Sequence, residues 1–125
     1  MPFSKEFQDV FNSIKLACDN SGFDCLRADD IWEESTFIQD IFSLILKSKA
    51  VIVDFSGRNA NVLYETGIAH TLGKIVIPIT QSKADIPSDL GHHRALFYLN
   101  NGEGLSQMED KLVKRLSILK GDNIL

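Results

Sequence analysis

AVIVDFSGRNANVLYETGIAHTLGKIVIPIT, residues 50–80, is the stretch that decides how this chain folds. It opens with the apolar run 50–53, which ends in an acid, and it closes with a second apolar run, 75–79. Continuous apolar runs of this length predict strands that are covered on both faces, as in a parallel sheet. Residues 61–72 between them have helical character, and Gly73 with Lys74 is typical of a helix end. The stretch therefore predicts a strand–helix–strand unit.

The same alternation continues on both sides of this unit. Residues 4–20 predict an amphipathic helix capped by Ser4, and a short strand is predicted over 23–28. A second helix of about 14 residues follows. A third clear strand is predicted over 95–99, before the last helix. The apolar stripe expected on the second helix is Phe37, Ile38, Ile41, Phe42 and Ile45, and that on the last helix is Leu105, Met108, Leu112, Leu116 and Leu119.

Strands that alternate with helices predict an α/β fold, here a flavodoxin-like three-layer sandwich whose parallel sheet has about four or five strands. Its 125 residues suit a single domain, 1–125. In a sheet of this type a buried strand precedes the first helix, yet here only Met1-Pro2-Phe3 stands before it. Either the sheet lacks its first strand, or the native gene begins upstream.

Composition narrows the class of protein. With 44% hydrophobic and 24% charged residues the chain is ordinary for a globular protein, which argues against disorder. The net charge is -4, and the sequence has no block of like charges, so no nucleic-acid partner is indicated. No apolar run approaches the roughly 20 residues of a membrane helix, and no secretion signal is evident. Cys18 and Cys25 fit no metal-ligand spacing and are expected to be reduced and partly buried, which favours a cytoplasmic protein without membrane partners.

Polar residues gather where the first strand of the central unit ends. Ligands of open parallel sheets bind beyond the carboxyl ends of the strands, and Asp54 stands at such an end. The loop 56–59 follows, in which Gly57 permits a positive φ or the close approach of a ligand. Free N–H groups at the start of the next helix favour anions or hydroxyls. Asn61 and Glu65 are four residues apart, which places both on one face of that helix.

Each of these residues also has a purely structural explanation. Asp54 can cap the loop, Asn61 can be a helix N-cap, and Glu65 can favour the helix dipole or pair with Arg58. Taken together, an acid, an amide and a tyrosine around one cleft indicate a ligand site, with Glu65 as its central residue. His92 and His93 are adjacent and lack an evident third ligand, so we expect no metal and no cofactor.

Three segments resemble the nucleoside 2-deoxyribosyltransferase-like and TIR-like superfamily. They are MPFSKEF (1–7), DFSGRNANVLYETGIAHTLGK (54–74) and DIPSDLGHHRALFY (85–98), and the match spans nearly the whole chain. In the deoxyribosyltransferases an acid in an E-x-G-x-A context is the nucleophile. The resemblance maps that role to Glu65, which begins Glu65-Thr66-Gly67-Ile68-Ala69. In TIR-type NAD glycohydrolases a helical glutamate instead holds ribose hydroxyls and stabilises positive charge on the sugar.

The resemblance implies further roles. Asp54 would be a second catalytic residue that orients sugar hydroxyls, assisted by Asn61. Phe3 would stack on a base or pack in the core, and Tyr64 would position the nucleophile or simply pack. The loop departs from the Gly-Thr-Ala pattern of the founding transferases, and its Arg58 is either a ligand for a phosphate group or a solvated surface residue. The predicted substrate-binding residues are Phe3, Ser56, Gly57, Arg58, Asn59, Asn61 and Tyr64.

The function implied is cleavage or base exchange at the N-glycosidic bond of a nucleoside, nucleotide or NAD-like molecule. The alternative is a non-catalytic nucleotide-sensing or self-associating TIR-like module. Because the deoxyribosyltransferases build their sites with help from neighbouring subunits, the resemblance also implies a homo-oligomer.

Overall fold

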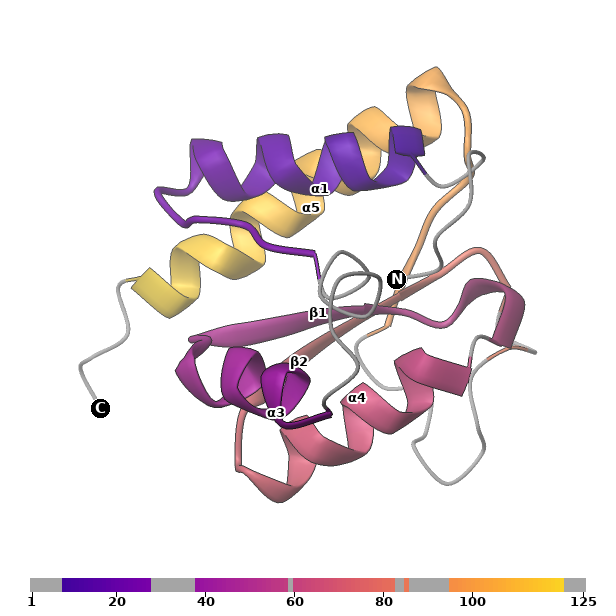
Figure 1. Ribbon diagram of the computed structural model, residues 1–125. Helices are drawn as coiled ribbons and strands as arrows, with labels where there is room; N and C mark the ends of the chain where they lie inside the picture. The colour runs from indigo at the N-terminus through magenta and orange to yellow at the C-terminus, as the bar shows by residue number, and fades with distance from the viewer. Residues whose placement is uncertain (1–7, 28–37, 59, 83–84, 86–94, 121–125) are drawn as a thin grey trace. The chain divides into compact units, whose positions relative to one another are not determined.

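The computed structural model describes residues 8–27, 38–58, 60–82, 85 and 95–120 (Figure 1). The chain divides into two compact units. The first unit comprises Arg27–Phe97, and the second comprises residues 8–26 and 98–120 of the described chain. A single domain over 1–125 stays a prediction, because the two units are not placed relative to each other.

The first unit is a parallel α/β unit. Strands β1 (Ala50–Asp54), β2 (Ile75–Thr80) and β3 (Leu96–Phe97) pair in the order β1-β2-β3, and both pairings are parallel. The first pairing aligns Ala50 with Ile75 and Asp54 with Ile79. The α/β class and the parallel sheet are therefore confirmed. The sheet has three strands in the part of the chain that the structure describes.

Helices α3 (Ile38–Lys47) and α4 (Ala60–Thr71) pack on one face of this sheet (Figure 1). One apolar cluster joins Val62 of α4 to Val53 and Phe55, and another joins Ala69 to residues of α3. α4 ends as predicted, since Lys74 N donates to Ala69 O at 2.9 Å in a turn with Gly73 at φ 71°. Burial of each large apolar side chain in these clusters stabilises the fold by about 1.5–3 kcal/mol.

The strand predicted over 23–28 is wrong for its described part, since residues 23–27 form no strand. The segment has alternating exposure, with Leu26 74% exposed, but the sheet pairs only β1, β2 and β3 in the described chain. An extended segment becomes a strand only beside a hydrogen-bonded neighbour. The strand predicted over 95–99 is likewise shorter, because only Leu96 and Phe97 pair with β2.

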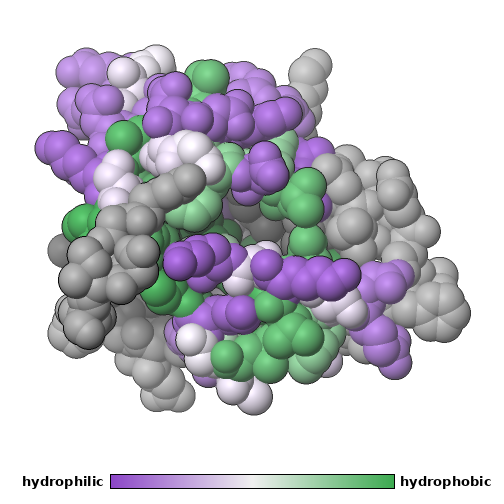
Figure 2. Space-filling view, turned by 90° about the vertical axis from the view of Figure 1, so that its left-hand side faces the viewer, coloured by the Kyte–Doolittle hydropathy of each residue, from purple (hydrophilic) through white to green (hydrophobic). Residues whose placement is uncertain are grey.

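The predicted stripe of the second helix needs one correction, because Phe42 is 43% exposed. Ile41 and Ile45 are buried as predicted, whereas Phe37 and the side chain of Ile38 lie outside the described residues. The buried stripe of α3 is thus narrower than its apolar pattern. Leu46 is also exposed, and hydrophobic residues, in green, are visible on the surface in Figure 2.

The second unit is a pair of helices, α1 (Gln8–Asn20) and α5 (Gly102–Lys120), that lie side by side (Figure 1). α5 begins at an Asn101 cap, whose Oδ1 accepts a hydrogen bond from Gly104 N at 2.7 Å. The predicted cap of α1, Ser4, lies outside the described residues. The predicted stripe of the last helix is confirmed, with Leu105 half-buried and the rest buried. The buried side chains of the two helices are Val10, Ser13, Ile14, Ala17, Cys18, Met108, Leu112, Leu116 and Leu119.

Candidate functional site

Asp54 ends β1 and is fully buried, with 0% of its surface exposed. Its Oδ1 accepts a hydrogen bond from the backbone N–H of Ser56 at 2.9 Å. This is the loop-capping geometry that Asp prefers in turns, in which the side chain bonds the backbone two residues on. Capping of the loop, one of the explanations that the sequence left open for Asp54, is therefore observed.

The loop after β2 is tied to the loop after β1 by two hydrogen bonds. Ser56 Oγ accepts from Gln81 N at 2.8 Å, and Asp85 Oδ2 accepts from Gly57 N at 3.1 Å. We call Asp54, Ser56, Gly57, Gln81 and Asp85 the strand-end cluster. Sequence reasoning missed Gln81 and Asp85 as members of the site. Their signal was their position just beyond β2, since parallel neighbours end at the same edge of a sheet.

Gly57 adopts a left-handed conformation, with φ 78° and ψ 2°. Of the two roles that the sequence allowed for this glycine, a positive φ is the one observed. A Cβ at residue 57 would meet nothing within 4 Å, so backbone conformation and not lack of space requires glycine here. The conformation turns the residue 57 N–H toward Asp85 rather than leaving it open.

Glu65 lies on the buried stripe of α4 and is 4% exposed. The stripe has helical spacing and also contains Val62, Thr66 and Ala69, which are 1%, 1% and 0% exposed. Thr66 satisfies its hydroxyl locally, because its Oγ1 donates to Val62 O at 2.8 Å. A carboxylate within such a stripe is uncommon, since burying a charged group is costly unless it is paired.

The side chain of Asp54 and helix α4, which contains Glu65, lie on opposite faces of the sheet. Val53 belongs to the apolar cluster that contains Val62, so its side chain faces α4. Side chains of a strand alternate between faces, and Asp54 therefore points to the opposite face of the sheet from Val53. A ligand that touches both carboxylates would have to lie beyond the end of β1, which is where ligands of parallel sheets bind.

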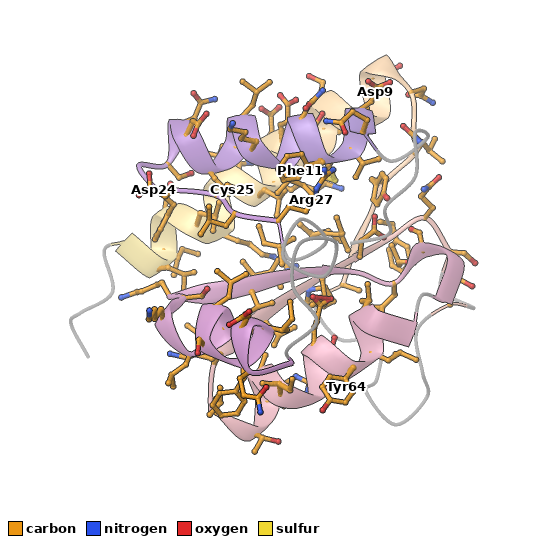
Figure 3. All side chains as sticks on the ribbon, in the orientation of Figure 1. Asp9, Phe11, Asp24, Cys25, Arg27 and Tyr64 are labelled. Carbon is orange, nitrogen blue, oxygen red and sulfur yellow. The ribbon has the colours of Figure 1, made fainter. Side chains whose placement is uncertain are left out.

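The other predicted site residues are described in part. Tyr64 is 53% exposed and lies on the side of α4 away from the sheet (Figure 3), so it does not share the buried stripe of Glu65. Arg58 ends the short helix η2 (Ser56–Arg58) and Asn61 lies in the first turn of α4, but the side chains of both fall outside the described set. Phe3 and Asn59 lie outside the described residues.

In the described part of the chain, no group of three or more His, Cys, Asp or Glu side chains could hold a metal ion. None of the helices described is both long enough and apolar enough to cross a membrane.

Comparison of the chain with protein-family models, with curated proteins and with solved structures finds no match in any of the three.

Proposed function

We propose that the protein binds a nucleoside, a nucleotide or an NAD-like molecule and cleaves or exchanges its N-glycosidic bond, with Glu65 as the central carboxylate. The site would lie beyond the carboxyl ends of β1 and β2, next to the strand-end cluster. The proposal includes a flavodoxin-like sheet of about four or five strands, the usual frame for such a site. It also includes a homo-oligomer in solution, which light scattering would test.

The burial of Glu65 carries this proposal. Glu65 is 4% exposed on a stripe with Val62, Thr66 and Ala69, at a position that hydrophobic residues usually take. Acids are almost never fully buried unless they are paired, so this burial points to a specific use of the carboxylate. Glu65 also begins the Glu-x-Gly-x-Ala context that resembles the deoxyribosyltransferase nucleophile.

The chemistry asked of Glu65 is within reach of a carboxylate. It would either attack the anomeric carbon, giving a glycosyl ester that water or another base resolves, or stabilise positive charge on the sugar without a covalent bond. In both cases the departing base takes the bonding electrons, and an acid near its nitrogen would help. Asp54, at the end of β1, would orient sugar hydroxyls.

A second function is favoured by a specific observation. The same 4% exposure leaves little of the Glu65 side chain accessible, and Asp54 points to the other face of the sheet. A binding module that recognises a nucleotide without turnover does not require the two carboxylates to converge on one sugar carbon. This is the nucleotide-sensing alternative, and it uses the same strand-end cluster.

The deciding experiment measures both binding and the release of free base. Purified protein would be incubated with deoxynucleosides, nucleotides and NAD, with free base followed by chromatography and binding by calorimetry. Glu65→Gln is the test variant, because it keeps the size of the side chain and removes its charge. Glu103→Gln, at an exposed glutamate of α5, is the matched control, and thermal melting verifies that both variants fold.

Base release that is lost in Glu65→Gln and kept in Glu103→Gln supports the enzyme. Binding without any release supports the sensing module. Full turnover by folded Glu65→Gln would disprove the role of Glu65, and a protein that neither binds nor releases base would disprove both functions.

A further inference from the structure

The chain reverses direction at the end of α1. Cys18 O accepts hydrogen bonds from Ser21 N at 3.1 Å and from Phe23 N at 2.9 Å, in a helix-terminal turn where Gly22 has φ 80°. These bonds satisfy a carbonyl that the last turn of a helix would leave unpaired. The chain then runs back along α1, and Figure 3 shows Cys25 on this returning segment. The turn therefore brings residues 18 and 25 of the second unit together.

The two cysteine side chains are hydrogen-bonded to each other, and neither is in a disulfide. Their exposures differ, since Cys18 is buried at 5% exposure and Cys25 is only partly buried. A dissolved reagent thus reaches Cys25 first. The hydrogen bond between the two side chains places Cys18 next to Cys25.

The two thiols also differ in pKa, and the more exposed Cys25 has the lower value. The hydrogen bond that Cys18 donates lowers the pKa of Cys25, and Lys15 adds to this effect, while burial and Asp19 oppose it. The pKa of Cys18 is raised well above that of an ordinary thiol by its hydrogen bond to Cys25 and by burial. Because the thiolate is the reactive form, we expect the pair to react first at Cys25, which is also the more exposed of the two.

We propose that Cys18 and Cys25 are an oxidative modification site, a dithiol that hydrogen peroxide converts to an intrachain disulfide and that a dithiol reductant restores. Cys25 is the residue that peroxide attacks, and Cys18 is the residue that resolves the product. The site lies in α1 and its returning segment, and it does not depend on the function proposed for Glu65.

Oxidation of the two thiols to a disulfide takes two steps, in which all atoms and electrons balance. Cys25 thiolate attacks one oxygen of hydrogen peroxide, the O–O bond breaks, and the departing hydroxide takes the proton that Cys25 released, giving a sulfenic acid and water. Cys18 then loses its proton and attacks the sulfur of residue 25. The S–O bond breaks, and hydroxide leaves with that proton as a second water. The two thiols lose two electrons and two protons, and peroxide is reduced to water.

The test is a mass measurement on the full-length protein. After exposure to hydrogen peroxide the protein is unfolded in N-ethylmaleimide, which labels every remaining thiol, and is then digested with trypsin. Cleavage after Lys15 and Arg27 leaves both cysteines in one peptide, residues 16–27. We expect this peptide to lose the mass of two hydrogen atoms and both labels, and to regain both labels after dithiothreitol.

Variants assign the two roles. Cys25→Ser should slow oxidation of residue 18 by about tenfold or more, because it removes the reactive thiolate. Cys18→Ala should stop the reaction at a sulfenic acid on residue 25, which dimedone traps. It should also move the pH midpoint of peroxide reactivity upward, because the thiolate of residue 25 loses the hydrogen bond that lowers its pKa.

Some results would overturn the proposal itself, and others only the roles assigned to the two cysteines. Free cysteine in the same tube is the positive control for oxidation by peroxide. If it is oxidised while the wild-type peptide 16–27 remains fully labelled, the proposal is overturned. A disulfide found only between two chains would also overturn it. Equal oxidation rates in wild type and Cys25→Ser would overturn the assignment of roles. The wild-type peptide map decides the main point even if a variant fails to fold.

Discussion

At the scale of single residues, the conformation of Gly57 sets the geometry of the strand-end cluster. Its φ of 78° costs an L-residue roughly 1–2 kcal/mol. We expect Gly57→Ala to lower the free energy of unfolding by about that amount, as measured by urea denaturation. Gly67→Ala is the matched control. Residue 67 is within α4 and a Cβ there meets nothing within 4 Å, so alanine should stabilise the helix by about 0.5–1 kcal/mol.

Equal effects of the two glycine substitutions would contradict the left-handed conformation of residue 57.

Asp85 gives a second prediction at this scale, which rests on the proposed function. Its carboxylate accepts a hydrogen bond from Gly57 N–H. Without this bond, the same N–H could donate to a phosphate oxygen of a bound nucleotide. Asp85→Ala frees that donor and removes a negative charge. We expect the ratio of nucleotide affinity to nucleoside affinity to rise by about five- to tenfold. This is the change expected for one additional hydrogen bond, which contributes roughly 1 kcal/mol. Calorimetry measures this ratio.

Asp85→Asn separates the two causes of the expected gain. Its amide oxygen can still accept from Gly57 N–H, so this variant loses only the charge. An unchanged nucleotide-to-nucleoside ratio in both Asp85 variants would show that the ligand does not approach Gly57.

The site residues differ in how far sequence predicts them. The positive φ of Gly57 follows from the residue type, and the position of Glu65 on the inner face follows from the spacing of its helix. The bond between Gly57 and Asp85 does not follow from either. It joins residues 28 positions apart, and it exists because β2 pairs in parallel beside β1 with Asp54 opposite Ile79. Pairing partners and register are set by tertiary structure.

At the scale of elements, the helices and the two long strands form where their sequence patterns predict them, whereas short extended segments do not. The segment 23–27 has the alternating exposure of a strand and lacks a ladder in the described chain. Alternation reports which side chains are buried, and hydrogen bonding to a neighbour is a separate condition. The predicted extension of β3 to residue 99 is wrong for the same reason, since Leu99 is 66% exposed and does not pair with β2.

The start of α5 gives a prediction at this scale. Asn101 Oδ1 accepts from Gly104 N at 2.7 Å, and its carbonyl oxygen accepts from Leu105 N at 2.9 Å. Asn101→Ala removes the cap and should lower the free energy of unfolding by about 1 kcal/mol. Asn101→Asp keeps an acceptor oxygen and should cost much less. A chemical denaturation series compares them, and an equal loss in both variants would argue against capping by this side chain.

At the scale of the whole molecule, the order of segments along the chain couples the two units. The second unit is assembled from residues 8–26 and 98–120, and the first unit occupies the sequence between them. α1 and α5 bury their apolar stripes only when these distant segments meet. Closing a disordered loop of that length costs conformational entropy, and a folded first unit reduces the cost by restraining its own two ends. Folding of the first unit therefore favours pairing of α1 with α5.

This coupling predicts one cooperative unfolding transition, as a single domain over 1–125 requires. Fluorescence of Trp32, which belongs by sequence to the first unit, and helical circular dichroism should give the same urea midpoint. Leu112→Ala, at a side chain that is 0% exposed on α5, should cost about 3 kcal/mol and lower both midpoints together. Ile118→Ala, at 70% exposure on the same helix, should leave both nearly unchanged. If Leu112→Ala shifted the dichroism midpoint and left Trp32 fluorescence in place, the units would unfold independently, and the single-domain prediction would be wrong.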